Sequence, residues 1–123
     1  MFDDIKCDAQ LPDDRLPTGT WCQTKSLASC MERFTITTEG RLVRHRYRSE
    51  LIGEREIRPG IIMPKYRSIP VGDTDLEYHG DIRFYGSLAD GPLVDYVARF
   101  THGALEWIRP YDDLSDMRKG WLD

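Results

Sequence analysis

The sequence is poor in several features that usually identify a protein class. Its 123 residues include no asparagine, four lysines and three cysteines, and the longest aliphatic run is Ile61–Met63. A helix that crosses a bilayer needs about 20 mostly apolar residues, and the first eight residues lack the apolar stretch of a secretion signal. This length is typical of one globular domain. We therefore expect a single domain, 1–123, that is cytoplasmic and does not span a membrane.

The cysteines do not predict a disulfide framework or a metal site. Cys7, Cys22 and Cys30 are odd in number and none is paired at the Cys-x-x-Cys spacing. Reduced thiols are the favoured interpretation. A zinc site made of these three residues and His45 is the alternative, disfavoured because zinc ligands usually come in pairs two to four residues apart. We expect no metal and no cofactor.

Familiar catalytic motifs are also missing. The chain has no phosphate loop, dinucleotide fingerprint, His-Glu-x-x-His helix or calcium loop. No serine or cysteine stands in a Gly-x-Ser-x-Gly context. These absences favour a protein that is not an enzyme.

Charge is distributed unevenly along the chain. The net charge of −4 combines −3 for residues 1–40, +5 for 41–67 and −6 for 68–123. Thirteen of the 17 cations are arginines, which form forked pairs with carboxylates and phosphates. The acidic total argues against general nucleic-acid or membrane binding. The basic central segment, residues 41–67, favours binding to an anionic partner.

Alternation of polar and apolar residues predicts a mainly β fold. In residues 76–85 the even-numbered positions form an apolar face and the odd-numbered ones a face of titratable groups. Thr20–Lys25 predicts a short strand, and Leu27–Met31 a helical turn or an extension of that strand. Residues 53–75 have no clear period and hold six of the 17 Pro and Gly residues, which predicts an irregular loop.

Two hairpins are expected, over residues 32–51 and 93–110. The second turns at His102-Gly103, because glycine accepts the positive φ of a tight turn. This turn sets three cross-strand pairs: Phe100 with Leu105, Ala98 with Trp107, and Arg99 with Glu106. The first turns at Glu39-Gly40, and a two-residue loop there would pair Ile36 with Val43, Phe34 with His45, Thr35 with Arg44 and Arg33 with Arg46. A bulged three-residue loop would shift this register by one and exchange the buried face.

Together these segments predict a mainly antiparallel sheet, or a small sandwich, of about six strands, with strand 76–86 between the hairpins. A short C-terminal helix follows Pro110. It is expected to be capped by Asp112 or Asp113 and to end at Gly120, with Leu114 and Met117 on one face.

Arginines form the first candidate site. If Arg44, Arg46 and Arg48 share a strand face, they offer planar donors to a phosphate or an acidic protein. The alternative is a solvated sheet face whose charges are neutralised by neighbouring strands.

His79 and Asp81 form the second candidate site, because they are two residues apart on the expected strand and Glu77 flanks them. They could act as a general acid and base or hold a divalent ion. A surface histidine bonded to its neighbours is the simpler interpretation.

Aromatic residues are the third feature. Phe34, Phe84, Phe100 and Trp107 fall on the predicted core face. The tyrosines left available to a partner are Tyr66, Tyr85 and Tyr111.

Short motifs occur along most of the chain except residues 50–72. They are Met1-Phe2-Asp3, Ile5-Lys6-Cys7, Leu11-Pro12-Asp13, Gln23-Thr24-Lys25-Ser26-Leu27, Phe34-Thr35-Ile36-Thr37, Gly40-Arg41-Leu42 and Tyr78-His79-Gly80-Asp81-Ile82-Arg83-Phe84-Tyr85. This pattern resembles a family of short bacterial and phage-borne proteins, in which Asp-Gly usually stands where this chain has Glu39-Gly40. The family has no established activity and supplies no catalytic residue. The resemblance implies a small soluble cytoplasmic protein whose gene neighbours are accessory and host-conflict genes.

The leading functional hypothesis is a non-enzymatic module that binds a protein partner, as an inhibitor or accessory protein of phage or prophage origin. The expected binding residues are Arg44, Arg46, Arg48, Arg58, Lys65, Tyr66 and Arg67. The alternative is a phosphate-like or nucleotide-like anion held by Arg44, Arg46, Arg83 and Arg99. A hydrolase or metalloenzyme at Glu77, His79 and Asp81 is a third hypothesis, and pairing of two copies through an exposed edge strand is compatible with the pattern.

Overall fold

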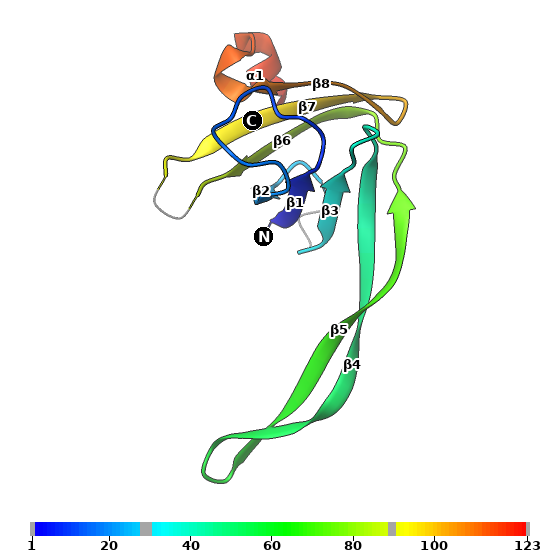
Figure 1. Ribbon diagram of the computed structural model, residues 1–123, viewed down its shortest axis with the longest axis vertical. Coiled ribbons are helices and arrows are strands. Elements are labelled where there is room, and N and C mark those ends of the chain that lie inside the picture. Colours follow the sequence, from blue (N-terminus) through cyan, green and yellow to red (C-terminus); the bar gives the residue numbers. More distant parts are fainter. Residues whose placement is uncertain (1, 28–30, 89–90, 123) are drawn as a thin grey trace.

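A computed structural model describes residues 2–27, 31–88 and 91–122 of the chain. The described residues form one eight-stranded sheet in the order β5-β4-β3-β1-β2-β6-β7-β8 (Figure 1). The strands are β1 (Asp3–Cys7), β2 (Trp21–Thr24), β3 (Arg33–Ile36), β4 (Leu42–Arg58), β5 (Ile61–Asp75), β6 (Gly80–Gly86), β7 (Val94–Thr101) and β8 (Ala104–Pro110). A 3₁₀ turn, η1 (Tyr111–Asp113), and one short helix, α1 (Asp116–Leu122), end the chain.

The mainly β prediction is confirmed, but its details are corrected. The sheet has eight strands rather than about six, it is one sheet and not a sandwich, and it is mixed because β1 and β3 run parallel. The additional central strand is β1, between β2 and β3. Its alternation of charged residues with Ile5 and Cys7 is short, and buried Asp3 makes it less recognisable. The Asp3 carboxylate accepts a hydrogen bond from the Glu32 N–H at 2.9 Å. No described helix is long and apolar enough to cross a membrane.

The core lies on one face of the sheet. Its fully buried side chains include Ile5, Phe34, Phe84, Tyr96 and Phe100. The connection from β1 to β2 folds over this face, because Leu16 lies in the same cluster with 3% of its surface exposed. Phe34, Phe84 and Phe100 therefore confirm the predicted core positions.

The β7–β8 hairpin turns at His102-Gly103 as predicted, with both residues at positive φ. Phe100 pairs with Leu105, but a bulge follows, so that Arg99 opposes Trp107 and Ala98 opposes Ile108. The expected pairs of Ala98 with Trp107 and Arg99 with Glu106 are therefore wrong. The extra residue, Glu106, accepts a hydrogen bond from Thr101 Oγ1. Trp107 consequently leaves the core face and lies half-buried beside the guanidinium groups of Arg109 and Arg118.

The β3–β4 hairpin adopts the register of the bulged loop, not of the two-residue loop. Thr37 donates its N–H to Arg41 O, Gly40 has a φ of +80°, and Phe34 opposes Arg44. This register places Leu42 in the core. The same face then continues outward along β4 to Arg44.

The prediction of an irregular loop at residues 53–75 is wrong. Both strands of a long hairpin run through this segment and turn at Pro59-Gly60, where Gly60 has a φ of +81°. The prolines are compatible with a strand because β5 is an edge strand. Gly53 and Gly72 lie at shifts in the strand register. Figure 1 shows that this hairpin extends well beyond the rest of the molecule.

Two other segments differ from expectation. β6 starts at Gly80 rather than at residue 76, because Glu77 has a positive φ that interrupts the strand. Met117 is exposed and Gly120 lies inside α1 rather than ending it. Ser115 caps α1, because its Oγ accepts the Arg118 N–H at 3.3 Å. The β2 strand confirms the Thr20–Lys25 prediction, whereas most of the Leu27–Met31 turn lies outside the described residues.

Candidate functional site: a projecting two-stranded arm

The distal part of the β4–β5 hairpin, residues 46–72, is here called the arm. His45 is the last residue of β4 that pairs with β3. Beyond His45, β4 leaves the sheet and pairs only with β5. Two faces and two backbone edges of the arm are therefore open. Almost every arm residue is exposed, and none is fully buried.

Basic side chains collect on one face of the arm, called the basic face. Cross-strand partners point to the same side of a sheet, so the register aligns Arg48 with Ile69, Arg55 with Met63 and Arg58 with Ile61. The six cations of this face are Arg46, Arg48, Arg55, Arg58, Lys65 and Arg67, and Arg44 continues the row into the sheet.

Backbone bulges produce this alignment. In a regular strand Arg55 would point away from Arg48, because successive residues alternate. Register shifts between Leu51 and Gly53 and between Glu56 and Arg58 each insert one residue. As a result Arg55 and Arg58 both return to the basic face, while Glu54 and Glu56 point to the other side. One anion, Glu50, remains on the basic face.

The opposite face of the arm is the tyrosine face. It includes two acidic residues, but its exposed apolar side chains dominate: Tyr47, Leu51, Ile62, Pro64 and Tyr66. In the whole arm nine large hydrophobic residues are exposed, out of 14 among the described residues of the chain. The expected binding residue Tyr66 is thus on the arm but on the face opposite Arg58, Lys65 and Arg67.

The cations of the basic face are largely unpaired. Within the described part of the chain, Arg67 alone among the six forms an ion pair, a 3.3 Å contact with Glu50 in which both side chains are well exposed. At the root of the arm the Nε atom of Arg44 is buried and has no hydrogen-bond partner there. The alternative in which neighbouring strands neutralise this row therefore does not describe the arm.

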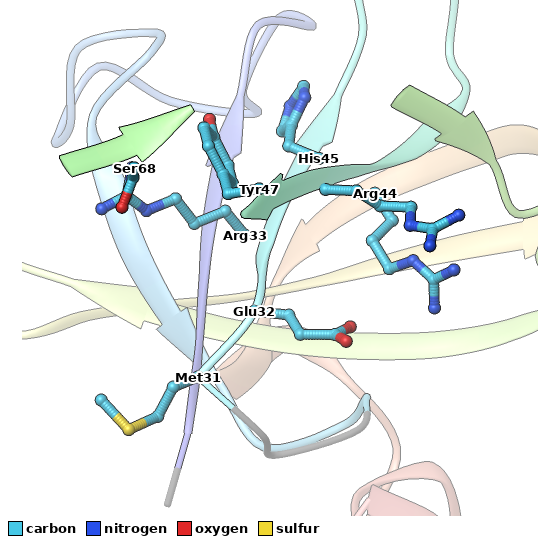
Figure 2. A pocket seen from close by; sticks show the side chains of 8 residues that line it. Met31, Glu32, Arg33, Arg44, His45, Tyr47 and Ser68 are labelled. Carbon is cyan, nitrogen blue, oxygen red and sulfur yellow. The ribbon is translucent and has the colours of Figure 1, made fainter. Parts of the chain in front are cut away.

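A cleft of about 560 Å³ marks the point where the arm leaves the sheet. Figure 2 shows the side chains of Arg44 and Glu32 on the right of the view, and those of Arg33, Tyr47 and Ser68 on the left. The Arg33 guanidinium lies over the Tyr47 ring, 5.2 Å from its centroid. This cleft is polar and open, and it joins the two faces of the arm at its base.

His45 is held at this root by two hydrogen bonds. Its Nδ1 lies 2.8 Å from Asp73 Oδ1 and its Nε2 lies 2.6 Å from Thr35 Oγ1. Both ring nitrogens are thus occupied by protein partners. Burial raises the pKa of Cys7 to about 12 and that of Cys22 to about 11, so that both thiols are protonated at neutral pH. The described residues contain no cluster of three metal-ligating side chains, and Cys30 lies outside them.

Arg83 and Arg99 are not brought to the arm. Arg83 forms a bidentate pair with Asp95, at 2.7 Å, and stacks on Tyr111. Arg99 and Arg118 both contact the Asp81 carboxylate, at 3.4 and 2.6 Å. β3, β1 and β2 separate their strands from β4. The four arginines of the anion-binding alternative therefore do not form one site, and Tyr85 and Tyr111 likewise lie on the body.

Glu77, His79 and Asp81 do not converge as a catalytic group. His79 Nδ1 accepts the His102 N–H at 3.1 Å and its ring stacks on His102. Asp81 is bonded to two arginines instead of to His79. Glu77 is exposed at the bend before β6. The polar contacts of this region connect β6, β7 and α1, and Arg99 Nη2 also lies 3.4 Å from His79 Nε2.

Sequence reasoning identified Arg44, Arg46, Arg48, Arg58, Lys65, Tyr66 and Arg67, all of which lie on the arm or at its root. It missed Arg55 and the exposed aliphatic residues Leu51, Ile57, Ile61 and Ile62. A signal was available: two segments rich in Ile and Arg flank Pro59-Gly60, a turn dipeptide.

A partly buried hydrogen bond outside the arm links the β1–β2 connection to the sheet. The Tyr96 hydroxyl donates a hydrogen bond to Asp13 Oδ1 at 2.5 Å, and Arg15 also bonds this carboxylate. Desolvation alone would raise the pKa of Asp13, but hydrogen bonds from Tyr96 and Arg15 outweigh it and lower that pKa. Desolvation and the bond to Asp13 together raise the pKa of Tyr96 to about 12.

Replacing Tyr96 with phenylalanine is expected to lower the free energy of unfolding by about 1–3 kcal/mol, the usual effect of losing a hydrogen bond to a charged group. Because the folded pKa of Asp13 is depressed, its contribution is present above the unfolded pKa and is lost as pH falls through the folded value. The variant should therefore lose less stability than the wild type between pH 5 and pH 2, measured by urea unfolding. Equal losses would contradict the role of this bond.

Comparisons with family models, curated proteins and solved structures found no match to this chain.

Proposed function

We propose that the chain is a non-enzymatic binding module and that its arm docks on an acidic surface of a protein partner. The observation that supports this most is the combination of exposed apolar residues and unpaired cations on a ribbon that has no core of its own. Monomeric soluble proteins rarely expose large continuous apolar patches, and such patches mark interaction sites.

The energetics of a two-stranded ribbon favour the same conclusion. An isolated hairpin in water is marginally stable at best, and a third strand or a packed face is needed to stabilise it. Beyond His45 the arm has neither a third strand nor a packed face. A partner that covers one of its faces would supply the missing burial.

The chemistry of the arm favours protein over nucleic acid. The tyrosine face combines apolar side chains with Glu54 and Glu56, which would repel a phosphate backbone. The basic face intersperses Ile61, Met63 and Ile69 among its cations. An acidic protein surface with apolar positions matches both features, and the cations would steer its approach.

Reversing three charges on the basic face tests the proposal. The variant Arg46→Glu/Arg48→Glu/Arg58→Glu is expected to reduce the amount of captured partner by at least about tenfold in pull-downs from native lysate, because close charge pairs at interfaces contribute several kcal/mol. The measurement is quantitative mass spectrometry of the captured proteins.

The matched control reverses the same number of charges on the body, away from Trp21: Lys25→Glu/Arg109→Glu/Lys119→Glu. This variant should capture its partners as the wild type does, while circular dichroism confirms that both variants are folded. Capture that survives in the arm variant, or that is lost equally in both, would contradict the proposal.

A further inference from the structure

The arm and the rest of the chain have net charges of opposite sign. The arm has six cations and three anions, which gives it a net charge of +3. Since the whole chain has a net charge of −4, the residues outside the arm have a net charge of −7. Figure 1 shows the arm directed away from the rest of the sheet. The basic face of the distal arm is therefore held apart from the acidic remainder of its own chain, whereas the remainder of a second copy is accessible to it.

Exposed apolar residues also occur both on the arm and on the body. The tip of the arm exposes Ile57, Ile61, Ile62 and Met63, with 45–61% of each side chain accessible. On the body, Trp21 and Leu93 are 49% and 66% exposed. These two residues line a groove of about 280 Å³ between the start of β2 and the end of β6.

The groove has a suitable form for an aliphatic side chain. Its floor includes Gly86 and Cys22, which lie so close that a Cβ on Gly86 would come within 2.8 Å of the Cys22 sulfur. Trp21 and Leu93 stand at its sides as exposed apolar walls. β2 is paired with β6 only through Gln23 and Thr24, so this end of the two strands is left open.

We propose that the partner of the arm is a second copy of this chain, with the arm tip of one copy in the Trp21–Leu93 groove of the other. This inference rests on the proposed function and names its partner. Two such contacts related by a two-fold axis would bury the tips of both arms. A second copy also supplies the acidic surface at a fixed one-to-one ratio.

Light scattering coupled to size exclusion tests the inference on the full chain over a series of concentrations at low salt. The expected mass is at least twice 14.3 kDa, falling toward the single-chain mass on dilution and on addition of salt. The arm variant Ile61→Ser/Ile62→Ser and the groove variant Trp21→Ser should each be monomeric. Met117→Ser, which removes an equally exposed apolar side chain from α1, should associate like the wild type.

Mixing the two defective variants gives the sharpest result. The arm variant keeps an intact groove and the groove variant keeps an intact arm, so a mixed pair retains one native contact. The mixture should therefore contain a heterodimer that neither variant forms alone. Absence of a heterodimer, or unchanged self-association of either variant, would overturn the assignment of arm tip to groove.

Failure here is distinguishable from failure of the proposed function. A wild-type chain that stays at 14.3 kDa at every concentration overturns self-association. If the triple charge reversal still abolishes capture in that case, the partner is a different acidic protein. If capture also persists, both proposals fail.

Discussion

Replacing Phe84 with alanine is expected to lower the free energy of unfolding by about 3–5 kcal/mol, the usual cost of deleting a buried aromatic ring. Phe84 is 1% exposed, sits on β6 between β2 and β7, and packs against the Tyr96 ring at a centroid distance of 5.7 Å. Since domains of this size are stable by about 5–15 kcal/mol, the loss is a large part of the total. Urea unfolding followed by tryptophan fluorescence measures it.

The matched control is Tyr66→Ala on the arm. Tyr66 is an aromatic residue of the same sheet but is 59% exposed, so its removal should change stability by less than about 0.5 kcal/mol. The comparison is made at low protein concentration, where association contributes least. A Tyr66 variant as unstable as the Phe84 variant would mean that the arm packs on the body of its own chain.

Replacing Asp81 with alanine is expected to lower the free energy of unfolding by about 1–3 kcal/mol, the cost of leaving charged groups without their hydrogen-bond partner. The Asp81 side chain is 9% exposed and joins Arg99 of β7 to Arg118 of α1. The arginines are about 30% exposed, so water compensates part of the loss. Because Arg118 also lies over the Trp107 ring, the variant should release α1 from the sheet.

Hydrogen exchange of the α1 amides measures that release. Faster exchange in α1, with β7 unchanged, is the expected result for Asp81→Ala. Glu77→Ala removes an exposed carboxylate from the segment just before β6 and should leave both stability and exchange unchanged. Equal protection of α1 in Asp81→Ala and the wild type would show that the carboxylate does not hold the helix.

The body of the sheet was more predictable than the arm, for a physical reason. Period-two alternation arises where one face of a strand is buried, as for Ile82 and Phe84. The arm has no buried face, so residues 53–75 show no such period although most of them lie in β4 and β5. The prolines and glycines of this segment then favoured the interpretation as an irregular loop, which is wrong.

Registers were less predictable than turns. His102-Gly103 was recognisable from glycine chemistry, but the bulge at Glu106 depends on its hydrogen bond with Thr101, which no local pattern reveals. The same holds for the arm. Clustering of cations between residues 41 and 67 was visible in the sequence, whereas the alignment of Arg48, Arg55 and Arg58 on one face depends on two bulges.

The prolines of the arm have a consequence for how it can associate. An uninterrupted edge strand can add further strands without limit, the route by which exposed ribbons polymerise into fibrils. Pro64 and Pro70 lack the N–H that such growth requires, and Lys65 and Arg67 place like charges along the same strand. The arm is thereby protected against open-ended stacking, and its side chains remain available for a finite, specific complex.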